Sequence, residues 1–230
     1  MSAVLEVRGV YKRFGGVVAL EDVSLAVAPG EVVAVVGPNG SGKTTLVNVI
    51  SGYVAPDRGS VLLEGRDITR WSAERRVRAG VVRSFQFPLL FPNLTVEENL
   101  RVAASGLKPY TLGEVDRRVV EEALHLFDLE AVRRRRVTEL SEGHRKLLDV
   151  ALAFVFKPKV VLLDEPTSSV SSQEKFAVME KIVEVVKKSG ASAVVVEHDL
   201  EVVKKFTDRV VQMMAGRVVK VAKTAEWSHD

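Results

Sequence analysis

The segment that most constrains the fold of this chain is a glycine-rich run between two apolar stretches. It reads Gly37-Pro38-Asn39-Gly40-Ser41-Gly42-Lys43-Thr44 and matches the pattern GxxxxGK[ST]. The run directly follows the apolar stretch Val32–Val36 and directly precedes the helical pattern Thr45–Ile50. A buried strand that leads through a tight glycine turn into a helix is typical of an α/β domain, and we predict that fold class.

This turn has the features of a phosphate-binding site. A phosphate chain needs many hydrogen-bond donors without obstructing side chains, and a glycine-rich turn at a helix N-terminus supplies backbone N–H groups and a favourable dipole. We expect Lys43 to reach the β and γ phosphates of a nucleotide, and the Thr44 hydroxyl to hold Mg²⁺. A random chain of this length matches the pattern about once in a hundred times. The predicted nucleotide contacts in this segment are Gly37, Asn39, Gly40, Ser41, Gly42, Lys43, Thr44 and Thr45.

Two carboxylates, Asp164 and Glu165, directly follow the apolar run Val160–Leu163. Taken alone, an Asp-Glu pair after a strand usually caps a helix or belongs to a loop. Together with the phosphate turn, the pair predicts a magnesium site. Asp164 would bind the ion through water, because Mg²⁺ keeps part of its hydration shell, and Glu165 would polarise the attacking water.

Composition excludes several classes of protein. With 230 residues, 47% of them hydrophobic, the chain is long enough to bury the core of one globular domain. Its longest apolar run, Val150–Phe156, is far shorter than the roughly 18 residues of a membrane span. The lack of cysteine excludes disulfide scaffolds, zinc–cysteine sites and thiol nucleophiles. A net charge of +3 gives no reason to expect nucleic acid, and the N-terminus lacks the pattern of a secretory signal, so we expect a cytoplasmic protein.

Short β-branched runs define the expected strands. Three runs without helices between them predict an antiparallel β layer at the N-terminus: Val4–Val10, Val17–Leu20 and Val23–Val27. The strands that alternate with helices are Val32–Val36, Val81–Phe85, Val160–Leu163, Ala193–Val196 and Val210–Met214.

Helical patterns replace this β-rich texture between Phe87 and Leu140. Thr95–Ala104 opens with a good N-cap and two acidic residues, and Gly113–Leu129 carries apolar residues at helical spacing. We predict one domain over 1–230, with a nucleotide-binding core at 1–86 and 157–230 and an inserted helical subdomain at 87–156. A later helix, Ser172–Lys188, is expected to bury the stripe Phe176, Met179, Val183 and Val186.

Further motifs surround these in a definite order. Leu140-Ser141-Glu142-Gly143-His144 resembles the LSGGQ signature of the ABC ATP-binding family. Phe14 lies where that family stacks an aromatic ring on adenine, and Gln86 follows a strand as the Q-loop glutamine does. Ser168–Ser171 occupies the D-loop position and His198 the switch position. Each residue alone is more often a packing or loop residue, but the ordered set resembles this family over essentially the whole chain.

This resemblance implies a P-loop NTPase core of the RecA-like type, with ATP and Mg²⁺ as cofactors. By the same resemblance, the catalytic residues are Lys43, Gln86, Glu165 and His198. The nucleotide contacts beyond the turn are Phe14, Gln86, Ser141, Gly143, Asp164 and His198, and the metal ligands are Thr44, Gln86 and Asp164. In this family ATP lies between the phosphate turn of one subunit and the signature of a second, so hydrolysis implies a head-to-tail dimer, with a copy of this chain or with a paralogue.

The chain departs from the family pattern at three positions. Glu142 replaces the first glycine of the signature and His144 its glutamine, while Ser141 and Gly143 are kept. A carboxylate near phosphates repels them unless its side chain points away. Ser171 replaces the usual D-loop aspartate, which bears on communication between the two sites.

Within the family, the chain most resembles subunits that energise uptake of branched-chain and other hydrophobic amino acids. The resemblance implies integral membrane permease subunits and a second ATPase as partners, on the inner face of the cell membrane. The alternatives are an ATPase of lipopolysaccharide export and a soluble ATPase of iron–sulfur cluster assembly. The stretches that carry the likeness are Lys12–Leu20, Ile50–Gly52, Gly65–Thr69, Arg83–Gln86, Leu90–Leu100 and Glu197–Asp199.

Two surface features each have two alternative interpretations. The run Arg133–Arg136 is either a solvated face or a site for an anionic membrane or an acidic loop of a partner. The loop Gln86–Phe91 is apolar enough to predict contact with a permease, and the alternative is that its side chains pack the joint of the helical subdomain.

Overall fold

The computed structural model, which describes residues 3–84, 90–106 and 117–228, is an α/β protein with two sheets. The larger sheet has six strands in the order β10-β9-β3-β8-β7-β6, of which all but β10 run parallel to their neighbours. This arrangement confirms the predicted P-loop NTPase core. The strands are β3 (Val32–Val36), β6 (Val81–Arg83), β7 (Val160–Asp164), β8 (Ser192–Val196), β9 (Arg209–Met214) and β10 (Arg217–Lys223).

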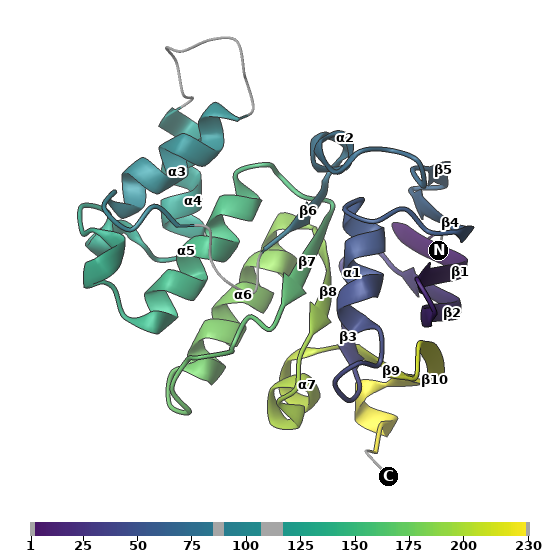
Figure 1. Ribbon diagram of the computed structural model, residues 1–230. Coiled ribbons are helices and arrows are strands. Elements are labelled where there is room, and N and C mark those ends of the chain that lie inside the picture. The colour runs from purple at the N-terminus through teal and green to yellow at the C-terminus, as the bar shows by residue number, and fades with distance from the viewer. Residues whose placement is uncertain (1–2, 85–89, 107–116, 229–230) are drawn as a thin grey trace.

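The predicted N-terminal antiparallel layer is also present, as a four-stranded sheet in the order β2-β1-β4-β5. Its strands are β1 (Leu5–Phe14), β2 (Val17–Val27), β4 (Arg58–Leu63) and β5 (Arg66–Asp67). The prediction of two separate strands at Val17–Leu20 and Val23–Val27 was wrong, because β2 continues through a bulge at Asp22, whose φ is 53°. Helix α1 (Lys43–Ser51) lies between this layer and the parallel sheet (Figure 1) and contributes Leu46 and Ile50 to their shared core.

Helices α6 (Lys175–Ser189) and α7 (Leu200–Phe206) cover the other face of the parallel sheet (Figure 1). The predicted apolar stripe of α6 is partly wrong, because Phe176 and Val183 are only partly buried. Phe176 instead packs at the helix edge against Phe206, with ring centroids 6.2 Å apart. The buried stripe consists of Val178, Met179, Ile182, Val185 and Val186.

Three helices, α3 (Val96–Ser105), α4 (Arg117–Leu126) and α5 (Glu142–Phe154), pack together beside the sheet (Figure 1). Thr95 caps α3 as predicted, in a capping box with Glu98. Phe127 and Phe154 meet edge to face in the core of this group, with ring centroids 5.3 Å apart. The boundaries at 87 and 156 stay a prediction. Shorter elements are α2 (Ala73–Ala79), η1 (Glu130–Val132), η2 (Val137–Glu139) and η3 (Thr224–Glu226).

The run Arg133–Arg136 divides into two kinds of residue. The Arg133 guanidinium lies 2.8 Å from a carboxylate oxygen of Glu121 and 3.0 Å from one of Glu97, so it joins α3 to α4. Its hydrogen bonds to these two carboxylates raise the pKa of Arg133 above its ordinary value. The other three arginines of the run are exposed. Among the residues that the structure describes, no helix combines the length and apolar character needed to cross a bilayer.

Arg76 of α2 is fully buried and ties α2 to the end of α1. Its Nη1 donates to the carbonyls of Val49 at 2.6 Å and Ile50 at 2.7 Å, which belong to the last turn of that helix. Nη2 donates to Thr69 O at 2.7 Å. Burial lowers the pKa of Arg76 to about 10. The cation stays charged at neutral pH and faces the negative end of the α1 dipole.

We therefore expect Arg76→Ala to lower the free energy of unfolding by about 3–5 kcal/mol, because it leaves several buried carbonyls without a donor. Arg78→Ala is the matched control on the same helix, since Arg78 is exposed and, among the residues that the structure describes, pairs only with Glu74; it should change stability by less than about 0.5 kcal/mol. Urea denaturation followed by circular dichroism measures both. Equal losses in the two variants would contradict this account of Arg76.

Candidate nucleotide-binding and catalytic site

The glycine-rich turn follows the carboxyl end of β3 and opens into a cavity of about 230 Å³. The cavity is walled by the turn and the start of α1, by Glu165 and His198 after two neighbouring strands, and by the segment Val17–Ala19 of β2. The structure thus brings together motifs that lie far apart in the sequence. The turn residues that line it are Asn39, Gly40, Ser41, Gly42, Lys43, Thr44 and Thr45.

Two glycines of the turn are required by close backbone approach. A Cβ on Gly37 would lie 2.2 Å from Met213 O, and one on Gly42 would lie 2.6 Å from Ala19 O. Their φ values, 151° and 101°, are also strained for residues with side chains. No other residue fits at these two positions, so the turn keeps its N–H groups near the cavity.

Lys43 is only 6% exposed and bends back over the turn. Its Nζ donates to Gly37 O at 2.7 Å and to Pro38 O at 2.9 Å. Burial lowers the pKa of Lys43, and the carboxylates of Glu165 and Asp164 oppose that shift. The buried Ser41 Oγ has no hydrogen-bond partner among the described residues. A buried cation, an unpaired hydroxyl and a glycine turn are the groups that a phosphate chain would satisfy.

Asp164 is 3% exposed at the end of β7, and its Oδ2 accepts a hydrogen bond from Arg83 Nη2 at 2.7 Å. Arg83 Nη1 also donates to Asn48 Oδ1 of α1 at 2.5 Å. The sequence analysis did not assign Arg83 to the site, although a charged residue in the apolar β6 run was a usable signal. Within the described ranges, no three His, Cys, Asp or Glu side chains form a metal cluster. A magnesium ion here would need Thr44, Asp164 and phosphate or water oxygens.

Glu165 and His198 form a carboxylate–imidazole pair in the wall of the cavity. Because β7 and β8 are parallel neighbours, the residues that follow them lie side by side, and His198 Nε2 is 3.0 Å from Glu165 Oε1. Glu165 has a left-handed φ of 49°, which its N–H supports by donating to Val196 O at 2.9 Å. The position of His198 is held in turn, because its N–H donates to the buried Glu197 at 2.9 Å.

Glu197 was not assigned to the site from the sequence. Its carboxylate also accepts a hydrogen bond from the Thr167 hydroxyl, so it joins the segment after β7 to the segment after β8. Burial raises the pKa of Glu197, and the hydrogen bonds from Thr167 and His198 oppose that shift. Glu197 is therefore a support for the Glu165–His198 pair.

The signature residues lie at the start of α5, as predicted, with Ser141 as its N-cap. Ser141 Oγ is 3.0 Å from His144 Nδ1 and also accepts from the His144 N–H. Arg145 Nη1 donates to Glu142 at 2.6 Å and neutralises the carboxylate that departs from the family pattern. Neither Ser141 nor Gly143 lines the cavity of its own chain.

Gly37, Asp164 and Phe14 are further predicted nucleotide contacts that do not line the cavity. Phe14 is 48% exposed at the end of β1 and is not among the lining residues, although the adjacent Val17–Ala19 segment is. Gln86 lies outside the described residues, as do the other members of the predicted apolar loop up to Leu89. Of that loop, Leu90 packs against the core and Phe91 is 51% exposed.

A buried lysine that was not assigned to the site from the sequence connects α5 to the turn that carries Glu165. Lys146 Nζ donates to Ser168 Oγ at 3.1 Å and lies 3.4 Å from Glu165 O. Burial lowers the pKa of Lys146, and Asp149 and Glu197 oppose that shift. The helix that carries the signature is therefore bonded to the turn that carries Glu165. A lysine among the apolar positions of a helix was the only signal in the sequence.

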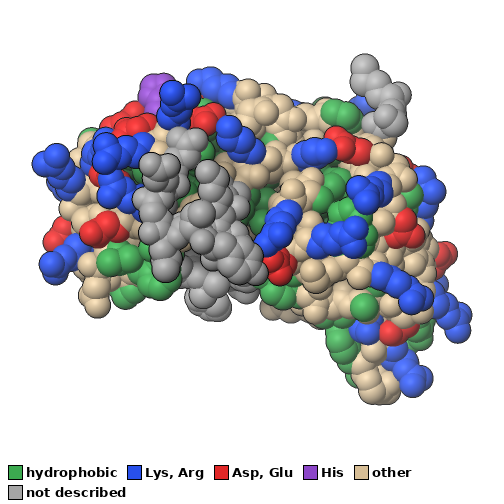
Figure 2. Space-filling model, turned by 90° about the horizontal axis from the view of Figure 1, so that it is seen from above, with side chains coloured by type: hydrophobic (Ala, Val, Ile, Leu, Met, Phe, Trp, Pro, Cys, Tyr) green, Lys and Arg blue, Asp and Glu red, His purple; other side chains and the backbone are tan. Residues whose placement is uncertain are grey.

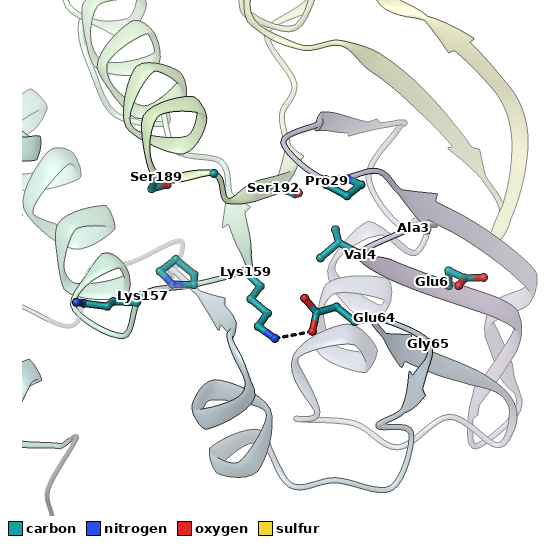
Figure 3. Close-up of a pocket in the computed structure, with 12 residues that line it drawn as sticks. Ala3, Val4, Glu6, Pro29, Glu64, Gly65, Lys157, Lys159, Ser189 and Ser192 are labelled. Atoms are coloured by element: carbon teal, nitrogen blue, oxygen red, sulfur yellow. Dashed lines mark hydrogen bonds and ion pairs between the residues drawn. The ribbon is translucent and has the colours of Figure 1, made fainter. Parts of the chain in front are cut away.

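A larger cavity, of about 610 Å³, lies at the amino ends of the parallel strands, opposite the ends that carry the nucleotide cavity (Figure 3). Lys159 and Ser192 line it at the amino ends of β7 and β8, and Glu64 faces them from the antiparallel layer. Lys159 Nζ and Glu64 Oε2 are 2.5 Å apart and join the two sheets. Ligands of parallel sheets bind at the carboxyl ends of the strands, and no predicted site residue lines this cavity.

A glycine-rich phosphate turn at the carboxyl end of a parallel strand, beside a buried Asp and a Glu–His pair, defines a P-loop nucleoside triphosphatase. The sequence profile described as ABC transporter matches residues 20–168. The chain therefore belongs to the ABC transporter family of ATP-binding cassettes and is an ATPase subunit of that family.

Individual relatives show how broad this family is. The chain is 37% identical over 96% of its length to the probable branched-chain amino acid transport ATP-binding protein LivG of Archaeoglobus fulgidus, and covers 89% of that protein. It is also 37% identical over 95% of its length to the ribose import ATP-binding protein RbsA 1 of Rubrobacter xylanophilus, of which it covers 44%. Among solved structures, the dimeric post-hydrolysis state of the cassette MJ0796 bound to ADP and Pi matches 97% of this chain and 100% of that one, with a TM-score of 0.81 and 27% identity.

Proposed function

We propose that this ATPase energises the uptake of branched-chain or other hydrophobic amino acids. The observation that carries the proposal is the 37% identity to LivG of Archaeoglobus fulgidus over nearly the full length of both chains. The ribose importer is equally identical, but the chain covers less than half of that protein. Sugar uptake is therefore the competing outcome of the test.

The site residues support a role for each group in ATP hydrolysis. Lys43 and the N–H groups of the turn hold the β and γ phosphates, and Phe14 stacks on adenine. Glu165 accepts a proton from the water that attacks the γ phosphate, and His198, 3.0 Å away, orients that carboxylate. Thr44, Asp164 and Gln86 would hold Mg²⁺, which would supply positive charge to neutralise the phosphates.

The position of the signature supports a head-to-tail dimer. Ser141 and Gly143 start α5 and do not line the cavity of their own chain. In a dimer the signature of the partner closes over the γ phosphate bound to Lys43, and the similarity to a dimeric cassette supports this assembly. We further propose that the dimer works with integral membrane permease subunits, on the cytoplasmic side of the membrane.

Reconstitution with its cognate permease subunits and binding protein tests the substrate. In vesicles that contain the complex, leucine with its binding protein should stimulate ATP hydrolysis and accumulate inside, whereas ribose should do neither. Stimulation by ribose alone would contradict amino acid uptake. The Glu165→Gln complex is the control for uptake that does not depend on hydrolysis.

A further inference from the structure

In the segment from Asp57 to Arg78, the acidic side chains are paired with other described residues, whereas most of the arginines are not. Its four carboxylates all have partners within the molecule. Asp57 accepts from Lys12, Glu64 pairs with Lys159, Asp67 accepts from Thr69 and Glu74 pairs with Arg78. The carboxylates of this segment are therefore already engaged.

Four arginines of the same segment have no such partner. Arg58, Arg66, Arg70 and Arg75 are exposed, and none of them forms an ion pair or a side-chain hydrogen bond with any residue that the structure describes. We call these four residues the arginine patch. Their guanidinium groups carry forked N–H donors suited to phosphate, and an anion outside this chain would satisfy them.

An aromatic side chain holds two members of the arginine patch in place. The guanidinium carbon of Arg75 lies 4.0 Å from the centre of the Trp71 ring, and that of Arg66 lies 4.6 Å from it. Stacking on an indole restricts both side chains. Tyr53, 57% exposed, follows the end of α1, against which α2 packs through Arg76. Trp and Tyr are the residues enriched at membrane–water interfaces.

The arginine patch lies away from the nucleotide site. Helix α2 and strands β4 and β5 lie at the top of Figure 1, where α1 ends, whereas the phosphate turn precedes α1 at its other end. The nine residues of α1 span about 13 Å between the phosphate turn and the helix end against which α2 packs. Figure 2 views this top face and shows Lys and Arg side chains spread over the half formed by these elements. An anionic surface could contact the patch without covering the nucleotide cavity.

We propose that the arginine patch binds the anionic headgroups of a phospholipid membrane. Basic side chains near an anionic bilayer each contribute about fivefold in affinity, and four guanidiniums without an ion pair to any described residue, two of them stacked on Trp71, match both the charge and the interfacial character of such a surface. The inference rests on the proposed function, because it gives a subunit that works at a membrane a direct contact with the lipid. An acidic protein partner is the competing explanation.

Vesicle sedimentation with the purified full chain, in the absence of any permease, tests this inference. The chain should bind vesicles of phosphatidylcholine with phosphatidylglycerol, should not bind phosphatidylcholine alone, and should dissociate as salt is raised. Arg70→Glu with Arg75→Glu should weaken binding by at least about 25-fold. In a Trp227→Phe background, Trp71 is the only remaining tryptophan, so its fluorescence should change on binding to the anionic vesicles.

A matched control makes the same change of charge elsewhere. Lys204 of α7 and Lys223 of β10 are exposed on elements at the opposite end of the molecule in Figure 1. Lys204→Glu with Lys223→Glu should keep the affinity of the natural chain. Equal loss of affinity in both double variants would show that net charge alone causes the effect, and would refute the arginine patch as the binding site. If the natural chain does not bind phosphatidylglycerol vesicles, the phospholipid is refuted as the ligand, in favour of an acidic protein. ATP hydrolysis by the same samples separates this inference from the proposed function, since a natural chain that hydrolyses ATP normally but does not bind phosphatidylglycerol vesicles contradicts the lipid contact alone.

Discussion

Replacing Glu165 by Gln should slow ATP hydrolysis by about 10²–10⁴-fold, the usual effect of a positioned base, which corresponds to roughly 3–5 kcal/mol of transition-state stabilisation. The amide has the shape of the carboxylate and can still bond to His198, which lies 3.0 Å from Glu165. It cannot accept a proton from water at neutral pH. ATP binding should therefore persist while the chemical step is lost. Single-turnover hydrolysis and isothermal titration calorimetry measure the two effects separately.

The same variant tests the proposed dimer, because ATP that is bound but not hydrolysed should hold two subunits together. Gel filtration with and without Mg-ATP should then show a dimer only with nucleotide. Glu180→Gln is the control, since Glu180 is an exposed acid of α6 and should leave hydrolysis unchanged. Hydrolysis at the natural rate by the Glu165 variant would refute the assignment of the base.

Lys43→Ala should lower the affinity for Mg-ATP by at least about 100-fold. Charge-assisted hydrogen bonds contribute about 1.5–3 kcal/mol each, and the Lys43 ammonium is expected to make two of them with the β and γ phosphates. Calorimetric titration with Mg-ATP measures the loss. The buried Lys43 Nζ also bonds to Gly37 O and Pro38 O, so a urea unfolding curve must show that the variant remains folded.

Lys188→Ala is the matched control for this change, because Lys188 is an exposed residue of α6 that pairs only with Glu184. Its affinity for Mg-ATP should equal that of the natural chain. If a folded Lys43→Ala chain binds Mg-ATP with unchanged affinity, the glycine turn has a structural role and the nucleotide lies elsewhere.

The sequence by itself determined the features that depend on neighbouring residues. The bounds of β3 at Val32–Val36 and the capping box of Thr95 were predicted correctly, because burial period and cap chemistry are encoded within a few positions. The phosphate turn is equally local, since its glycines and Lys43 all lie within the single run Gly37–Thr44. The position of Glu165 after a buried strand also followed from the pattern, and parallel pairing then placed it beside His198.

Prediction was weaker where a polar side chain has its partner in a distant element. Arg83, Lys146 and Glu197 support the site, but nothing near them in the sequence identifies Asp164, Ser168 or Thr167 as their partners. The short strands β4 and β5 carry a faint pattern, because most of their residues are exposed or only partly buried. The buried stripe of α6 was predicted at the wrong residues. The surface against which a helix packs, together with the helical period, decides which of its apolar residues are buried.

Whether a feature could be predicted from the sequence therefore depends on how far apart in the chain the interacting residues lie. Period, capping and turn geometry act between near neighbours and can be read from the sequence. Which of six similar arginines between Arg58 and Arg78 is buried was decided by tertiary structure alone. Arg76 reaches the carbonyl end of α1 and lies in the core, whereas Arg70 and Arg75 face outward. A buried charge is stable only where the folded chain supplies enough partners, and that supply exists only after α1 and α2 have packed together.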